Sequence, residues 1–170
     1  MIGIPIALLY VNAGEWLIHK YVLHGMGRKK SSFWHFHWNE HHRESRKNGF
    51  IDPSYLRSVF GDHAQGREAL GLFVAALAHV PLLPIAPAFA GTVIFSTWDY
   101  YRKHKRAHDD PEWGKTHLPW HYDHHMGSNQ HANWCVTHPW FDELMGTRIP
   151  MTQEQRAKIK PAALKMQPAL

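Results

Sequence analysis

The sequence has little cysteine and few carboxylates. The single thiol, Cys135, excludes an internal disulfide framework and a cysteine-rich zinc ribbon. Asp and Glu number 14, against 16 His and 19 Lys and Arg, in a chain of 170 residues. That length suits one domain with one hydrophobic core. Aromatic residues make up 13% of the chain, which does not fit a disordered protein.

Only two stretches of the chain are long and apolar. Residues 1–18 carry one charge, Glu15, and are about long enough to cross the core of a bilayer as a helix. Residues 69–98 form the second stretch, and its only ionisable side chain, His79, is a functional candidate within an apolar segment. A soluble protein with two core helices is the alternative, and the mean hydropathy of −0.43 favours it.

Prolines interrupt the second apolar stretch. Three of them lie within seven residues, from Pro81 to Pro87, so one continuous helix is excluded. We therefore expect a hairpin of two short helices, roughly residues 68–80 and 88–104. Each leg is short for a full membrane crossing.

Basic residues gather directly after each apolar stretch, between residues 20 and 47 and between residues 102 and 106. This placement follows the positive-inside rule of membrane proteins, and no nucleic-acid motif is present, so we expect no nucleic-acid partner. The sequence predicts an all-α integral-membrane protein with a His-rich helical cap on the cytosolic face. Residues 1–150 form the membrane domain, and residues 151–170 a polar C-terminal tail.

Histidine dominates the remaining sequence. Imidazole is the commonest metal ligand among side chains. Ten of the 16 histidines fall into four groups: His19 and His24; His37, His41 and His42; His104 and His108; and His121, His124 and His125. Histidines outside these groups are expected to be structural or on the surface.

Spacing within the groups predicts how the imidazoles share metal ions. Residues four apart lie on one helix face, and each such pair is expected to hold one ion. These pairs are His37 with His41, His104 with His108, and His121 with His125. Neighbours in sequence diverge by about 100° on an α-helix, so two adjacent histidines can serve two different ions. His19 and His24 are five apart and do not share a face of an α-helix.

Ten imidazoles exceed the four or so ligands of a single zinc site and suit two ions with four or five ligands each. Carboxylates are scarce in the groups, so a nearly all-nitrogen dinuclear site is predicted. Such ligands suit Zn, Fe, Cu or Ni.

The four groups, taken in order, resemble the fatty acid hydroxylase superfamily of integral-membrane, di-iron, histidine-box enzymes. The matching segments are HKYVLHG at 19–25, EHH at 40–42, WDYYRKHKRAH at 98–108, HYDHH at 121–125 and the closing NWCVTHPWFDELMGT at 133–147. The sequence departs from the family in the second box, H-x3-H-H in place of H-x2-H-H, and His35 is an alternative first ligand there. Phe141 is inserted between Trp140 and Asp142, and the family usually has four membrane helices.

The resemblance implies that all ten grouped histidines bind two iron ions. It implies a membrane-bound, non-haem di-iron oxygenase that hydroxylates an unactivated C–H bond of a lipid, with a fatty acyl chain favoured. Dioxygen and a separate electron donor of ferredoxin or cytochrome b5 type are then required. Zinc is expected to replace iron in purified protein. No catalytic residue beyond the ligands is predicted, and Glu15, Asp123 and Asp142 are candidates for orienting imidazole N–H groups.

Three alternatives remain open. Within the superfamily, a carotenoid ring or sterol hydroxylase or desaturase carries the same boxes. A soluble HD-type metal-dependent phosphohydrolase would use His108 and Asp109, but such sites need further metal-binding aspartates. A non-catalytic structural zinc protein would have no open coordination position and no redox activity.

Overall fold

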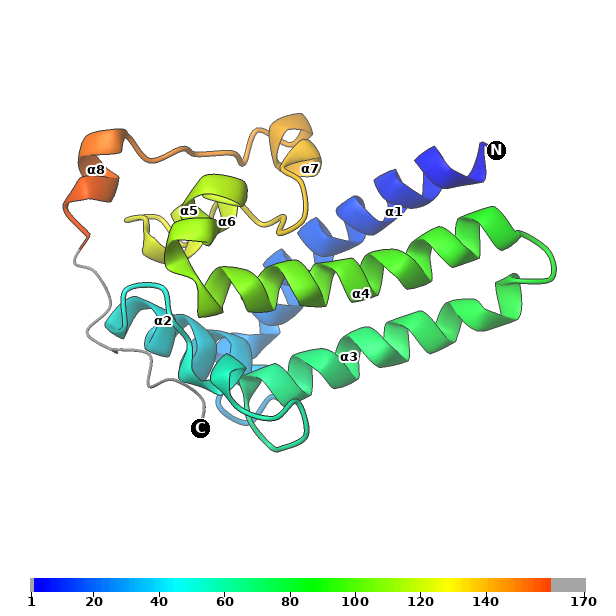
Figure 1. Ribbon diagram of the computed structural model, residues 1–170, viewed down its shortest axis with the longest axis horizontal. Helices are drawn as coiled ribbons and strands as arrows, with labels where there is room; N and C mark the ends of the chain where they lie inside the picture. The colour runs from blue at the N-terminus through cyan, green and yellow to red at the C-terminus, as the bar shows by residue number, and fades with distance from the viewer. Residues whose placement is uncertain (1, 160–170) are drawn as a thin grey trace.

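Residues 2–159 of the computed structural model are described, and all of their regular secondary structure is helical. Three long helices lie side by side in Figure 1: α1 (Gly3–Leu17), α3 (Ala64–His79) and α4 (Pro87–Asp109). α4 lies between the other two and packs against both. The all-α prediction is confirmed.

The predicted hairpin of two helices is α3 and α4. A short 3-10 helix, η5 (Val80–Leu82), follows α3, and Pro87 opens α4 at the first helical position, where its missing N–H costs nothing. Because the chain returns, the α3–α4 turn lies beside the N-terminus at one end of the molecule, and the short helices gather at the other end (Figure 1). The expectation that the hairpin returns is confirmed.

Short helices build the opposite end. They are α2 (Arg43–Lys47), α5 (Pro111–His117), α6 (Pro119–Met126), α7 (Trp140–Leu144), α8 (Gln153–Ala157), the 3-10 helices η2 (Met26–Arg28) and η4 (Pro53–Leu56), and the π-helices η1 (Ile18–Leu23) and η3 (His37–His42). Proline opens α5 and α6 as it opens α4. The Asp110 side chain caps α5 by accepting a hydrogen bond from the Trp113 N–H.

The prediction that residues 1–18 cross a membrane is corrected by the structure. Among residues 2–159, no helix combines the length and the apolar character that a crossing requires. α1 has 15 residues and is therefore only about 22 Å long. α4 is longer, but its second half carries the basic residues 102–106.

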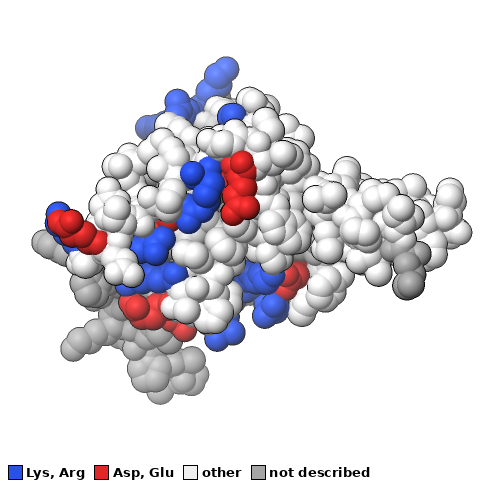
Figure 2. All heavy atoms as spheres, turned by 90° about the horizontal axis from the view of Figure 1, so that it is seen from above, with Lys and Arg blue, Asp and Glu red and all other residues white. Residues whose placement is uncertain are grey.

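Much of the apolar surface of the long helices is exposed. The narrow end of the molecule, at the right of Figure 2, shows no charged side chain on the face in view. Large exposed apolar side chains on or between these helices include Ile2, Ile4, Ile6, Leu9, Leu70, Phe73, Val74, Leu77, Ile85, Phe95 and Trp98.

The hydrophobic core lies at the wide end, where Phe50, Ala107, Leu118 and Tyr122 pack together. The chain after residue 150 returns to this core. Arg156 of α8 forms an ion pair with the buried Asp123, and Ile159 packs against the core. Residues 160–170 of the predicted tail lie outside the described residues.

Candidate metal centre

All ten grouped histidines meet inside the wide end of the molecule. Each is at most 2% exposed, although imidazole is usually partly exposed in proteins. They come from η1 with His24 directly after it, and from η3, α4 and α6, so four segments of the chain supply one site. Their ring nitrogens form two clusters rather than one.

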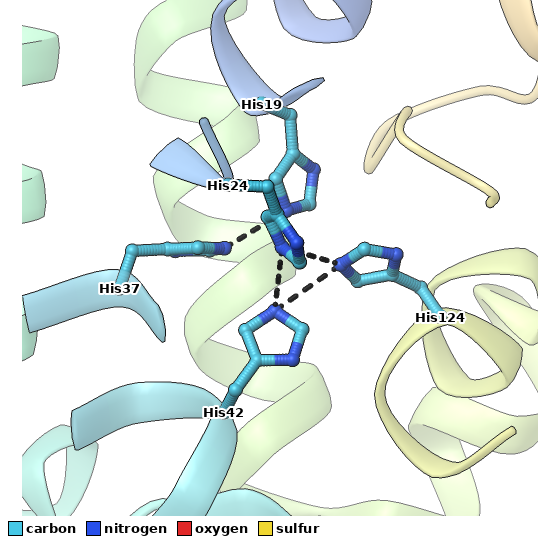
Figure 3. Close-up of side chains that lie close together, drawn as sticks. All are labelled: His19, His24, His37, His42 and His124. Carbon is cyan, nitrogen blue, oxygen red and sulfur yellow. Dashed lines mark hydrogen bonds between the residues drawn. The ribbon is translucent and has the colours of Figure 1, made fainter. Parts of the chain in front are cut away.

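The first cluster contains five imidazoles: His19, His24, His37, His42 and His124. Their Nε2 atoms point toward a common centre in Figure 3. The Nε2 atom of His124 lies 3.2 Å from Nε2 of His24 and of His42, and those two atoms are 3.0 Å apart. The Nε2 atoms of His19 and His37 are 2.9 Å apart.

The second cluster contains His41, His104, His108 and His125. His121 joins it through a 3.1 Å contact between its Nε2 and that of His108. The Nε2 atoms of His41, His104 and His125 are buried without any partner in the described structure. Orphaned nitrogens of this kind are rare in protein interiors unless a ligand uses them.

Adjacent histidines divide between the clusters, as predicted. His42 and His124 belong to the first cluster, while their neighbours His41 and His125 belong to the second. The rings of His42 and His125 stack at a centroid distance of 4.1 Å, so the two clusters share a wall. The ten imidazoles therefore form two neighbouring candidate metal positions, as the sequence predicts.

The pairing within η1 and η3 differs from the prediction. His37 joins His42 in the first cluster rather than His41, and His19 joins His24 although they are five apart. Both segments are π-helices, in which each turn closes between residues i and i+5. The His24 N–H donates to the His19 carbonyl at 2.9 Å, which brings residues five apart onto one face. The pairs His104 with His108 and His121 with His125 lie together as predicted.

The π-helical turn of η3 also accommodates the extra residue of the second histidine group. His37 is buried in the first cluster, whereas His35 lies outside both clusters and pairs with Glu40 at 2.9 Å. His37 is therefore the first ligand candidate of this group, and His35 is excluded from that role. π-turns recur at functional sites, where they re-aim a side chain.

The protonation of five imidazoles follows from their Nδ1 partners. A ring nitrogen that faces a carbonyl or carboxylate oxygen carries the proton, so the other nitrogen of that neutral ring presents a lone pair. These Nδ1 contacts join His19 to the Trp134 carbonyl, His41 to Asp52, His104 to Glu68, His108 to the Phe50 carbonyl and His124 to the Ala132 carbonyl.

Lone pairs that point at one another repel unless a cation lies between them. In the first cluster His19 and His124 direct bare Nε2 atoms at other imidazoles. In the second cluster His41 and His104 have bare Nε2 atoms without partners. The donor set therefore fits two metal cations, each held by Nε2 atoms whose tautomer is already set by the surrounding protein.

Burial keeps nine of the clustered imidazoles neutral. Desolvation lowers the pKa of His19 from its usual value to about 4. Burial, reinforced by neighbouring imidazoles, also places eight other pKa values below the ordinary range: those of His24, His37, His41, His42, His108, His121, His124 and His125. The neutral ring is the form that binds metal.

Backbone carbonyls that orient the ligands lie on two special segments. Phe50 adopts a φ of 86°, unusual for a bulky residue, and its carbonyl accepts from His108 at 2.7 Å. The loop at 130–134 supplies the carbonyls of Ala132 and Trp134 and the Gln130 Oε1, which lies 2.9 Å from Nδ1 of His42. Sequence reasoning misses such partners because any residue type offers a carbonyl.

Two carboxylates that orient ligands also escaped the sequence analysis. Asp52 Oδ2 lies 2.7 Å from Nδ1 of His41, and Glu68 Oε2 lies 2.7 Å from Nδ1 of His104. Burial raises the pKa of Asp52 to about 6. The Asp52–Pro53 dipeptide marks a turn close to the second histidine group, which is a usable signal, whereas Glu68 resembles any polar residue of a helix.

The three carboxylates predicted to orient imidazoles do not contact one in the described structure. Glu15 accepts hydrogen bonds from the backbone of residues 136 and 137 and from the Thr137 hydroxyl. Asp142 accepts from the N–H groups of residues 134 and 135, and Asp123 binds Arg148 and Arg156. Glu15 and Asp142 therefore hold the 134–137 segment in place. The Trp134 carbonyl of this segment orients His19, so the two carboxylates act on that ring through the backbone and not by direct contact.

The remaining histidines lie outside both clusters, as expected. His79 contacts the Ala75 carbonyl and the Tyr10 hydroxyl between α3 and α1, which is a structural position. His131 is exposed and stacks on Trp38 near the first cluster.

Neither cluster contains a carboxylate within residues 2–159, and Asp109, which pairs with Lys105, belongs to neither cluster. This arrangement disfavours the HD-type phosphohydrolase, which needs aspartate ligands. Comparison with models of known families, with curated proteins and with solved structures finds no match to this chain.

Proposed function

We propose that this chain is a membrane-bound, non-haem di-iron oxygenase that hydroxylates an unactivated C–H bond of a lipid, with a fatty acyl chain as the favoured substrate. The observation that carries the proposal is the pair of adjacent, buried, all-imidazole clusters with their Nε2 lone pairs turned inward. The order of the four histidine groups, which resembles the fatty acid hydroxylase superfamily, favours iron among the metals that imidazole suits.

The first cluster would hold one ion and the second cluster the other. Two ferrous ions, when bound, would supply the reduction of dioxygen that oxidation of an aliphatic carbon requires and that no side chain provides. The protein holds the ten ligand rings in place, fixes their tautomers through Nδ1 and excludes bulk water by burying them.

Lipid access is supported by the exposed apolar surface of the long helices. Monomeric soluble proteins rarely expose large contiguous apolar patches, and a larger one marks an interaction site such as a membrane surface. We propose that the narrow end enters a membrane, with the histidine clusters on the cytosolic side. A groove of about 360 Å³ between α3 and α4, lined in part by Phe73, Leu77 and Trp98, would take an acyl chain. Tyr101, at this groove, is one helical turn from His104.

An external electron donor is supported by a basic patch beside the first cluster. Arg28, Lys29 and Lys30 have no acidic partner among the described residues and follow one another on the surface. The Arg28 guanidinium lies 5.4 Å from the Trp38 ring, and that ring lies 4.9 Å from the ring of His24. An acidic carrier of ferredoxin or cytochrome b5 type that docks here would be separated from a ligand by a single aromatic ring.

Metal content and oxygen incorporation test the proposal together. The full chain is purified from membranes of iron-supplemented cells under anaerobic conditions, reduced and exposed to ¹⁸O₂ with the co-purified lipids. We expect two ions per chain and lipid products carrying one ¹⁸O atom. Replacing His124 and His125 by alanine should abolish both results, because the pair contributes one ligand to each cluster.

The matched control is His117→Asn, since His117 is exposed and lies outside both clusters. It should keep both ions and the labelled product. Zinc in place of iron does not count against the proposal unless iron reloading also fails. Two zinc ions that iron cannot replace, with no ¹⁸O in any lipid, would overturn it and favour a structural zinc protein.

A further inference from the structure

The two clusters differ in the charge of the groups that hold their Nδ1 atoms. In the second cluster these groups include two buried carboxylates, Asp52 against His41 and Glu68 against His104, both at 2.7 Å. The side chains of Asp52 and Glu68 are 3% and 9% exposed, so solvent screens them little.

Each carboxylate is held by a second donor. Asp52 Oδ1 accepts a hydrogen bond from the Ser54 N–H at 2.8 Å, and the Tyr55 hydroxyl donates to Glu68 Oε2 at 2.8 Å. These second donors fix the position of each carboxylate. The second cluster therefore has two carboxylates directly behind its imidazoles.

The first cluster has neutral groups in the same places. His19 and His124 face the carbonyls of Trp134 and Ala132, and His42 faces the side-chain amide of Gln130. A cation, Arg28, lies over the Trp38 ring, and that ring packs against His42 of this cluster. A metal ion in this position gains ligand orientation, but no carboxylate of residues 2–159 contacts the Nδ1 atoms of His19, His42 or His124.

A carboxylate that accepts the Nδ1–H bond makes the opposite nitrogen more basic and stabilises positive charge on the ion that it binds. Losing such a partner typically weakens metal binding 10- to 100-fold. A carbonyl partner orients the ring equally well but contributes only a dipole.

We infer that the two metal positions are inequivalent: the second cluster is the tighter one, and Asp52 and Glu68 are the positioning residues that make it so. This inference rests on the proposed two-ion site but not on the reaction or its substrate. During metal titration the second cluster binds its ion before the first cluster does. A chelator removes the ion of the first cluster before it removes the ion of the second.

Cobalt(II) titration of the metal-free full chain tests the inference. Cobalt bound by imidazoles absorbs visible light, so each binding step is measured without any enzyme assay. We expect two steps that differ at least 10-fold in affinity. Asp52→Asn and Glu68→Gln keep the hydrogen-bond acceptor and remove the charge, and each should weaken the tighter step 10- to 100-fold while the weaker step stays unchanged.

The reciprocal variant is Gln130→Glu, which places a carboxylate behind His42 of the first cluster. It should strengthen the weaker step about 10-fold and leave the tighter step unchanged. Because this variant adds affinity, a failure to fold cannot imitate the expected result, and helix content by circular dichroism checks each sample.

Two outcomes overturn the inference in distinguishable ways. Equal affinities, or a tighter step that responds to Gln130→Glu instead of to Asp52→Asn, refute the inequivalence and leave the two-ion function intact. Binding of fewer than two cobalt ions by the unaltered chain refutes both this inference and the proposed function.

Discussion

Acidification of the metal-free protein is expected to unfold it over a narrow range below pH 6.5. Nine grouped histidines have pKa values lowered by burial, so they stay neutral in the folded chain. In the unfolded chain each regains its ordinary pKa of about 6.5 and takes up a proton. The unfolded state then binds more protons, and stability falls as the pH falls.

The magnitude follows from linkage. Between pH 7.5 and 5.5, one histidine that is neutral when folded and titrates near 6.5 when unfolded removes about 1.4 kcal/mol from the free energy of unfolding. Nine such groups together remove on the order of 10 kcal/mol, which is comparable with the whole stability of a typical domain. Bound metal opposes this loss because protons must displace it from the same nitrogens.

Urea denaturation followed by far-ultraviolet circular dichroism measures the effect at several pH values. The chelated protein is compared with the metal-loaded protein in the same detergent. His124→Asn, within the first cluster, should make the pH dependence shallower by about one proton, whereas His117→Asn on the surface should leave it unchanged. The variant comparison separates the cluster from the other histidines.

A constant urea midpoint between pH 7.5 and 5.5 in the chelated protein would refute this reasoning. An equal pH dependence of the urea midpoint in the two variants would also refute it, because the groups that take up protons on unfolding would then lie outside the clusters. Either result would mean that the imidazoles are not held neutral by burial.

Three further predictions concern single residues. Asp142→Ala removes the acceptor of the Trp134 and Cys135 N–H groups, at 2.8 and 2.7 Å, and should cost about 3 kcal/mol in urea denaturation; an unchanged midpoint would contradict this. Gly114→Ala would place a Cβ atom 2.7 Å from the Phe50 ring and should cost about 1–3 kcal/mol, so a neutral result by the same assay would disprove the close packing. The thiol of Cys135, buried and with a raised pKa, should react with a thiol reagent only after denaturation, and rapid labelling of the native protein would disagree.

Sequence patterns identified the candidate ligands but not their arrangement. The ten grouped histidines were recognisable because metal-binding imidazoles must recur on nearby turns, and all ten are buried together. The helical hairpin was recognisable because prolines at 81–87 exclude a continuous helix. Neither argument depends on packing, so both hold before any tertiary structure is known.

The pairing of His19 with His24 and of His37 with His42 was not recognisable. Spacing rules assume an α-helix, in which residues five apart point in different directions. Whether a turn closes at i+4 or widens to i+5 depends on what packs against it, and here both segments widen to π-helices beside the site. The α-helical hydrogen-bond pattern of α1 likewise ends at Leu17, where the chain continues as η1, and no helix of residues 2–159 has the length and apolar character of a membrane crossing.

The sequence by itself predicted an all-helical chain with ten grouped imidazoles and almost no carboxylate among them. The tertiary structure decided which imidazoles share a cluster and which groups hold their rings. Asp52, Glu68 and the carbonyls of Trp134 and Ala132 become neighbours of the ligands only through folding. The physical reason is that ligand type is a property of a side chain, whereas tautomer and basicity are properties of its surroundings.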